Sequence, residues 1–588
     1  MKTTLKLMAL VLCLVMLVPC FAACADGAEE TPSTDASTQA PTNEPTQAPT
    51  NEPTQAPTGD EPTQAPTGDE PTQAPTGDEP TQAPTNAPDA TGDEPTQAPT
   101  EGSGEVPTYT DPVGSGDTAQ KPDDSDAPKE EGIDKYADLD GYVYKAYVRS
   151  KNTPNGSFAC EDFWVKEASS DPLSYAVYQR NADIEDEYNC KIKQYDSESA
   201  SQYEEMKRFH ENGEKYELAI VLSKDVAVCA TNALLLDIYT LDNIRLENAT
   251  YDHNSVDQFT MGGCLYYFSG DMNISPLDCA SVTVFNRDLF KTRDFAAACG
   301  KEEYADLYKM VDAGTWTVDA MLEMATVIQS YNGVAGGVLD AREGDTVGYF
   351  QYRASAPYYF YGCGARLSTL DGGYPEISYN SDTAEEVFNY LFEKMNTVQN
   401  PHMPCGMSSE RTAYYATGQT LFTDLLLWDV RGIFYKNNYV YGILPIPKYS
   451  AEQERYFDVV WWDLGTAHLW AVPSAINDKD YASFLLNVIA VYSARPDNTM
   501  DAYYTKTLSL AVAQDAGSRA TLKIVRDSLT YDICILYDWG GFIETTLNHI
   551  WDAEQNQYGD KITDAQLDVA EEEMEKTLES FKDHSAAA

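Results

Sequence analysis

The hydrophobic pattern that follows the repetitive N-terminal region alternates between short apolar runs and helical periods. Apolar runs at Tyr142–Val148, Cys190–Tyr195 and Tyr216–Leu222 have the length and composition of strands. Between them, Val177–Tyr188 and Tyr203–Asn212 have the pattern of helices. A β-α-β-α-β order of this kind predicts a layered α/β body with a largely parallel sheet.

A second series of elements follows toward the C-terminus. Thr317 is expected to cap a helix whose apolar face runs from Val318 to Ile328. Residues Thr563 to Gln566 fit a capping box, which predicts a final helix beyond them. The other predicted elements are strands at Cys264–Phe268, Ser281–Phe285 and Leu421–Leu427, and helices at Ser381–Asn396 and Ala482–Tyr492.

The stretch between two of the predicted strands indicates where the chain passes from one sheet to another. The apolar run Tyr441–Leu444 ends at Pro445, because proline lacks the amide hydrogen that a strand needs. A polar excursion and an aromatic run with Trp461 and Trp462 follow, and a new strand is predicted at His468–Val472. We therefore expect a crossing between two sheets, where a cleft lined with aromatic rings would bind a ligand.

The N-terminus has the pattern of an export signal. A basic start with Lys2 and Lys6 precedes the short apolar core Leu7–Val18, which is too short for a comfortable membrane span. Ala-Ala-Cys at the end of the signal resembles a bacterial lipobox, in which Cys24 would be lipidated after cleavage. We therefore predict a signal peptide at residues 1–24 and anchoring to a membrane through acyl chains.

The segment 25–135 is predicted to be a disordered tether. Its core is a repeat of Pro, Thr, Gln, Ala, Gly and acidic residues, without aromatic or large aliphatic side chains that could form a core. Proline-rich chain favours the extended polyproline II conformation. A lipid anchor followed by a long extended spacer suits a protein on the extracellular face of the cytoplasmic membrane that reaches into or through a thick cell wall.

Charge and cysteine content exclude several functions. The formal net charge of −54 argues against a nucleic-acid partner and against binding to anionic lipid by charge. Nine scattered cysteines follow the signal, without the spacing of a metal site, and we expect free buried thiols and no metal. The sequence also lacks a GxSxG, an HExxH and a P-loop motif.

Several phrases of the globular part, in this order, resemble the extracellular solute-binding proteins of bacterial ABC importers. The likeness is greatest to the family of oligosaccharide- and maltodextrin-binding proteins (family 1), which bind their ligand and do not turn it over. The phrases are RNADIEDEYNCKIKQYD, GGCLYYFSGD followed by SVTVFNRDLF, GTWTVDAMLEMA, ATGQTLFTDLLLWDV, and YGILPIPKY followed by LGTAHLWAVP.

This resemblance implies an α/β two-lobed periplasmic-binding-protein-like (type II) fold, with hinge crossings and an interlobe cleft. Lobe 1 is expected at residues 136–275 and 455–500, and lobe 2 at 276–454 and 501–588. In such proteins the ligand binds between the lobes and the hinge closes over it. The resemblance implies no cofactor.

Eight residues are predicted to contact a ligand. The resemblance matches Trp428 with a stacking tryptophan, Tyr358 with a tyrosine that contacts sugar, and Trp539 with a further aromatic residue. It also sets Asp278 or Cys279 where the family has a cleft glutamate. Position near the crossings adds Trp461, Asp463, Asp271, Tyr267 and Arg431, because aromatic faces and charged groups suit the apolar faces and hydroxyl rim of a sugar.

From these observations we predict a cell-surface lipoprotein that binds a carbohydrate, expected to be an oligosaccharide, and delivers it to the transmembrane subunits of an ABC permease. We expect no enzymatic activity. Two alternatives stay open: an extracellular hydrolase that acts on glycans with a pair of carboxylates, and a glycan adhesin or sensor that uses the same fold without transport.

Overall fold

The computed structural model describes residues 132–133, 135–153, 159–333, 336–432, 439–460, 467–512 and 515–587. All of them belong to one compact unit of the chain, Gly114–Ala588. The predicted signal peptide with Cys24, nearly all of the predicted tether, and Trp461, Trp462 and Asp463 lie outside the described residues. Within the described ranges, no helix combines the length and the hydropathy that a membrane span requires.

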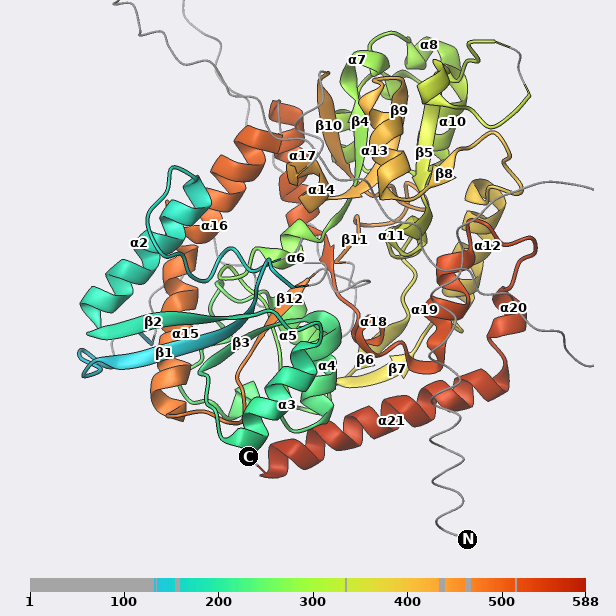
Figure 1. Ribbon diagram of the computed structural model, residues 1–588. Coiled ribbons are helices and arrows are strands. Elements are labelled where there is room, and N and C mark those ends of the chain that lie inside the picture. The colour runs from blue at the N-terminus through green and yellow to red at the C-terminus, as the bar shows by residue number, and fades with distance from the viewer. Residues whose placement is uncertain are drawn as a thin grey trace, which may run out of the picture. The chain divides into compact units, whose positions relative to one another are not determined.

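The first sheet has four strands in the order β12-β3-β1-β2 (Figure 1). Strand β1 pairs in parallel with both β2 and β3, and β12 pairs with β3 in the antiparallel direction. The β-α-β-α-β order and the largely parallel sheet predicted from the sequence are therefore confirmed. The strands are β1 (Tyr142–Arg149), β2 (Cys190–Ser197), β3 (Leu218–Leu222) and β12 (His468–Ala471).

Four helices accompany the first sheet: α2 (Pro172–Glu187), α3 (Gln202–Asn212), α4 (Ser223–Thr231) and α15 (Lys479–Ala494). Helix α2 packs on β2 and α15, whereas α4 packs on β3 and β12. Helix α2 begins a turn earlier than predicted, because Asp171 caps it and Pro172 occupies its first position. Proline is favoured there, since the first amide of a helix has no intrahelical acceptor.

The second sheet has five strands in the order β10-β4-β9-β5-β8. Strand β4 is antiparallel to both of its neighbours, and β5 is parallel to β9 and β8. Helix α10 (Val318–Ile328) packs on β5, and its predicted cap is confirmed because Thr317 accepts the amide of Ala320. The strands are β4 (Ser281–Asn286), β5 (Val347–Tyr352), β8 (Cys405–Gly406), β9 (Thr420–Leu426) and β10 (Tyr441–Pro445).

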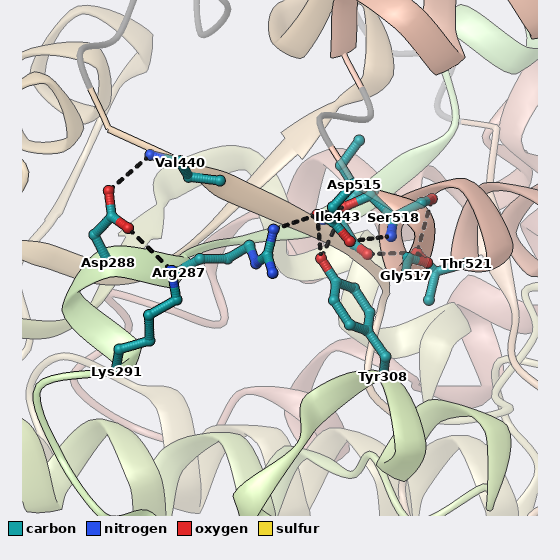
Figure 2. Close-up of polar contacts among 10 residues, drawn as sticks. All are labelled: Arg287, Asp288, Lys291, Tyr308, Val440, Ile443, Asp515, Gly517, Ser518 and Thr521. Atoms are coloured by element: carbon teal, nitrogen blue, oxygen red, sulfur yellow. Dashed lines mark hydrogen bonds and ion pairs between the residues drawn. The ribbon is translucent and has the colours of Figure 1, made fainter. Parts of the chain in front are cut away.

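Helix α17 (Ala516–Asp527) covers the edge strand β10 of the second sheet. Figure 2 shows side chains of the helix reaching the backbone of the strand. Ser518 accepts the amide of Ile443 at 3.2 Å, and Thr521 donates to the carbonyl of Ile443 at 2.6 Å. These bonds satisfy groups that would otherwise be open to pairing with another chain.

The two sheets are joined by segments that run side by side. Strand β11 (Asp458–Val459), on the way from β10 to β12, pairs in parallel with β13 (Leu529–Thr530), which follows α17. Val460 forms an antiparallel bridge with Ala280, which directly precedes β4. The predicted passage from the sheet of Tyr441–Leu444 to the sheet of His468–Val472 is confirmed, since β10 and β12 belong to different sheets.

The predicted strand at Cys264–Phe268 is wrong. Gly262 and Gly263 have φ angles of 62° and 84°, which turn the chain just before the apolar run. Leu265 then donates its amide to the Asp237 carboxylate at 3.1 Å and accepts the amide of Ile238 at 2.7 Å, so no ladder forms there. The run is apolar because it is buried, and burial alone does not distinguish a strand from irregular chain.

The remaining helices and strands pack around these sheets. A hairpin of β6 (Ser368–Asp371) and β7 (Tyr374–Ile377) follows α11, and the chain ends in the long helix α21 (Asp564–Ala587). All nine cysteines from Cys160 to Cys534 are free, and six of them are buried. The other helices include α5 (His253–Phe259), α6 (Ser275–Asp278), α7 (Arg287–Phe290), α8 (Phe295–Cys299), α9 (Leu307–Asp312), α11 (Ala356–Gly362), α12 (Asp382–Met395), α13 (Ser408–Ala416), α14 (Leu427–Gly432), α16 (Thr499–Asp501), α18 (Ile533–Tyr537), α19 (Phe542–Thr545) and α20 (Tyr558–Lys561).

Candidate functional site

A pocket of about 500 Å³ lies at the carboxyl ends of two parallel strands of the first sheet. Ligands of α/β proteins bind preferentially at this edge of a parallel sheet. Trp164 and Leu173 form an apolar wall of the pocket. Polar and charged residues make up most of the rest of its lining. These are Arg149, Ser150, Lys151 and Asn152 at and after the end of β1, Gln194 and Asp196 of β2, and Glu161, Asp171, Ser174, Arg431 and Thr507.

A much narrower gap adjoins this pocket and shares Cys160, Glu161 and Arg431 with it. Its walls come from the first sheet at His468, from the crossing at Asp278, and from helix α14 at Trp428. The free space is about 20 Å³, which accommodates about one water molecule. A sugar ring therefore fits the larger pocket, whereas the gap has to widen before one can enter it.

An ion-pair network closes the gap. The Arg431 guanidinium lies 2.8 Å from a carboxylate oxygen of Asp278 and 3.1 Å from one of Glu161. The hydroxyl of Tyr503 donates to the other oxygen of Asp278. Burial raises the pKa of Asp278 to about 6, although Arg431 favours the ionised form. The network thus links α14, the crossing and the wall of the first pocket through charged groups, one of which is partly neutral near pH 6.

A second polar cluster fixes the wall that carries Glu161 and Trp164. Asp162 accepts the amide of Ile274 at 2.6 Å and the thiol of Cys160 at 3.1 Å. Buried Arg180 of α2 donates to the carbonyl of Phe163 at 2.6 Å. Burial raises the pKa of Asp162. These bonds attach the wall both to helix α2 and to the crossing before β4, so the pocket is held by ordered structure on that side.

Two of the predicted ligand contacts, Trp428 and Arg431, lie together at the gap. Helix α14 begins directly after β9, and side chains three positions apart lie on the same face of a helix. Trp428 is partly exposed. Their role in binding stays a prediction, but the structure places an aromatic ring and a guanidinium in the lining of the same gap.

Three other predicted contacts are core residues in this structure. Tyr358, Tyr267 and Trp539 are 1%, 0% and 1% exposed. The Tyr267 hydroxyl lies 3.3 Å from that of Tyr537, and the ring of Tyr537 stacks on Trp539 at a centroid distance of 5.4 Å. None of the three lines either pocket described above. As ligand contacts they stay predictions that would require a different conformation.

The last predicted contacts fall elsewhere. Asp271 forms an ion pair with Arg526 at 2.8 Å and lines neither pocket. Trp461 and Asp463 lie outside the described residues, in the segment that precedes His468. The sequence analysis overlooked Trp164 and Glu161. The available signal was their position shortly after the first strand of a parallel sheet, where the carboxyl edge gathers functional groups.

The described ranges contain no group of three or more His, Cys, Asp or Glu side chains arranged to hold a metal ion. The binding chemistry of the pocket consists of the ring of Trp164 together with carboxylates, amides, hydroxyls, guanidinium groups and the ammonium group of Lys151. Such groups contact an uncharged polyol through stacking and hydrogen bonds.

No protein-family model matches the chain, and no curated protein matches its sequence. Among solved structures, the chain is similar to a cyclo/maltodextrin-binding protein complexed with maltotetraose, with 11% identity, 74% of this chain and 96% of that chain covered, and a TM-score of 0.48. It is also similar to UspC of M. tuberculosis (13% identity, 73% and 100% covered, TM-score 0.46). A third similar structure is the ABC substrate-binding protein Lmo0181 from Listeria monocytogenes in complex with cycloalternan (11% identity, 75% and 100% covered, TM-score 0.43).

Proposed function

We propose that the protein binds a carbohydrate in the pocket beside Trp164 and Arg431 and hands it to an ABC permease. The observation that carries this proposal is a pocket at the carboxyl edge of one sheet, next to a gap lined by His468 of that sheet and by helix α14, which directly follows a strand of the other sheet. We propose that the crossings act as a hinge between the two sheets, so that a ligand would be enclosed when the gap closes.

The lining of the pocket suits a sugar. The ring of Trp164 offers a flat apolar surface for the face of a pyranose, and Trp428 offers a second one at the gap. Carboxylates accept hydrogen bonds from hydroxyl groups, and a guanidinium donates them, so Glu161 and Arg431 suit the hydroxyl rim. Glu161 and Arg431 are already paired with each other at 3.1 Å, so a hydroxyl group that binds them would join an ordered polar network.

The two-lobed division proposed for the chain agrees with where the strands fall in the sequence. All four strands of the first sheet lie within 136–275 and 455–500, and all five strands of the second sheet lie within 276–454. We propose these ranges as the cores of two lobes, with the pocket between them. We further propose that the segment 501–588 completes lobe 2.

The proposed location is the outer face of a membrane. It rests on the lipobox-like sequence that ends at Cys24 and on the proline-rich segment 25–135. Metabolic labelling with a palmitate analogue, comparing the wild type with Cys24→Ala in an exporting bacterial host, tests the anchor. Label in the wild type and none in the variant is expected, and equal labelling would refute Cys24 as the lipidated residue.

A thermal-shift screen against oligosaccharides, with peptides as the comparison set, tests the ligand class. Titration calorimetry of the strongest saccharide should then show weaker binding to Trp164→Ala by about 1–3 kcal/mol, as expected on losing a buried aromatic contact. Stabilisation by peptides alone would contradict the proposal. Release of shorter saccharides during the titration would show turnover and favour the hydrolase alternative.

A further inference from the structure

A tight glycine turn on the first sheet's side contacts the β6–β7 hairpin and the C-terminal helix α21. The turn is Gly262-Gly263, and the chain after it is held to the first sheet because Phe268 and Trp470 of β12 exchange backbone hydrogen bonds at 3.0 Å. Gly262 donates its amide to the carbonyl of Gly373, at the tip of the β6–β7 hairpin, at 2.8 Å.

Helix α21 closes on the same turn. A methyl group built on Gly262 would lie 2.6 Å from Leu578 and 2.9 Å from Lys582, whereas the same group on Gly263 would meet nothing within 4 Å. Lys582 in turn lies over the ring of Tyr374, beside Gly373 in the hairpin, at 4.8 Å. We call the contact of Gly262 with Gly373, Leu578 and Lys582 the turn clamp.

The middle of α21 rests on the segment of Trp539 and Gly540. Trp539 donates to Thr577 at 3.1 Å, and Gly540 donates its amide to Glu573 at 2.9 Å. The segment of Trp539 and Gly540 continues into α19, where Phe542 stacks on Tyr379 at 4.7 Å. Tyr379 lies between the β6–β7 hairpin and α12 in the sequence, so these contacts connect the middle of α21 to that part of the chain.

The C-terminal end of α21 is bound to the first sheet's side. Tyr266 donates to the carbonyl of Phe581 at 2.6 Å, and its ring packs edge-on against Phe581 at 4.7 Å. Ser585 donates to Asp237 at 2.5 Å, and a ring nitrogen of His584 lies 3.1 Å from the carbonyl of Ala230 in α4. One helix therefore joins both sides without using the crossing segments.

We infer that the turn clamp and α21 form a lock that holds the two sheets in the observed arrangement, so that the gap beside Arg431 opens only when the lock loosens. The crossing segments are the hinge about which one sheet would rotate relative to the other. The clamp resists that rotation because the hydrogen bond from Gly262 to Gly373 and the contacts of Gly262 with Leu578 and Lys582 would have to break. The inference holds for whichever ligand enters the gap.

Two alanine substitutions distinguish the effect of the turn clamp from the backbone strain that any glycine-to-alanine change causes at a positive φ angle. Gly262→Ala and Gly263→Ala both place a side chain at a positive φ angle, of 62° and 84°, and so carry comparable backbone strain. Only Gly262→Ala places a methyl group against α21, where the ends of the Leu578 and Lys582 side chains would have to shift. Hydrogen exchange of the full-length, ligand-free chain, followed by mass spectrometry, should show exchange in residues 271–280, 456–460 and 528–532 faster by roughly fivefold or more in Gly262→Ala than in Gly263→Ala.

Leu578→Ala supplies a second approach if Gly262→Ala fails to fold. It removes one side of the clamp without adding strain, and exchange in the same crossing segments should again rise above the wild type. In the double variant, the smaller side chain at 578 makes room for the new methyl group, so exchange should fall below that of Gly262→Ala. Equal exchange in Gly262→Ala and Gly263→Ala, or a change confined to α21 in Leu578→Ala, would overturn the lock.

Discussion

Two buried aspartates with similar partners differ in what surrounds them. Asp278 at the gap and Asp424 in β9 each accept a bond from a buried tyrosine hydroxyl, and burial raises the pKa of each to about 6. Asp278 faces a pocket and an arginine that reaches solvent, whereas Asp424 is 0% exposed and sealed among Tyr349, Tyr359 and the second sheet. The comparison shows that similar polar chemistry serves binding only where the packing leaves space beside it.

Removing the sealed carboxylate should have the largest effect. Asp424→Ala leaves the hydroxyls of Tyr349 and Tyr359 without their acceptor and opens a cavity, so we expect a loss of about 3 kcal/mol in the free energy of unfolding. Urea denaturation measures it. The ligand affinity of the folded fraction should be unchanged. A reduced affinity in samples that are folded to the same extent would contradict the claim that Asp424 is buried away from the ligand site.

The pH dependence of stability should separate the ionised and neutral forms of Asp424. Its folded-state pKa is raised from 3.8 to about 6, so its contribution is fully present below pH 4 and is lost as the pH rises through 6. Relative to Asp424→Asn, the wild type should therefore lose up to about 3 kcal/mol between pH 4 and pH 7. Paired urea titrations across this range measure the difference, and a constant difference would show that Asp424 does not titrate.

Two aromatic residues, one at the gap and one in the core, allow the same comparison, with a smaller expected change in free energy. Trp428→Ala should weaken saccharide binding by about 1–3 kcal/mol, because a ring at the gap is lost. Tyr267→Phe is the matched control, since it keeps a buried ring and removes only a hydroxyl that contacts Tyr537. Calorimetry with the saccharide selected in the screen should show unchanged affinity for the control. Equal losses in both variants would remove the distinction between gap and core.

The sequence was enough to predict the elements that a continuous run of apolar residues marks. The continuous apolar runs gave the strands of the first sheet, and Pro445 marked the end of β10 and the start of a crossing. The predicted capping box at Thr563 is only half formed. Thr563 accepts the amide of Gln566 at 3.3 Å, but the Gln566 side chain bonds to the carbonyl of Gly540 instead.

The binding pocket was harder to predict because long-range contacts assemble it. The segment that carries Trp164 shows no periodic pattern of apolar residues in the sequence. It is held in place by a hydrogen bond between Asp162 and Ile274, which are 112 positions apart. Tyr358 and Trp539 could not be separated from Trp428 by composition, since aromatic residues make up 11% of the chain and most of the large ones are needed in the core. Only the fold decides which ring faces open space.

Hydrogen exchange of the wild type with and without the saccharide selected in the screen tests the central claim most directly. Binding in the pocket between the two sheets predicts protection in residues 159–165 and 427–432, together with the crossing segments. Protection confined to other surfaces, or none at a saturating concentration, would contradict the placement of the ligand site.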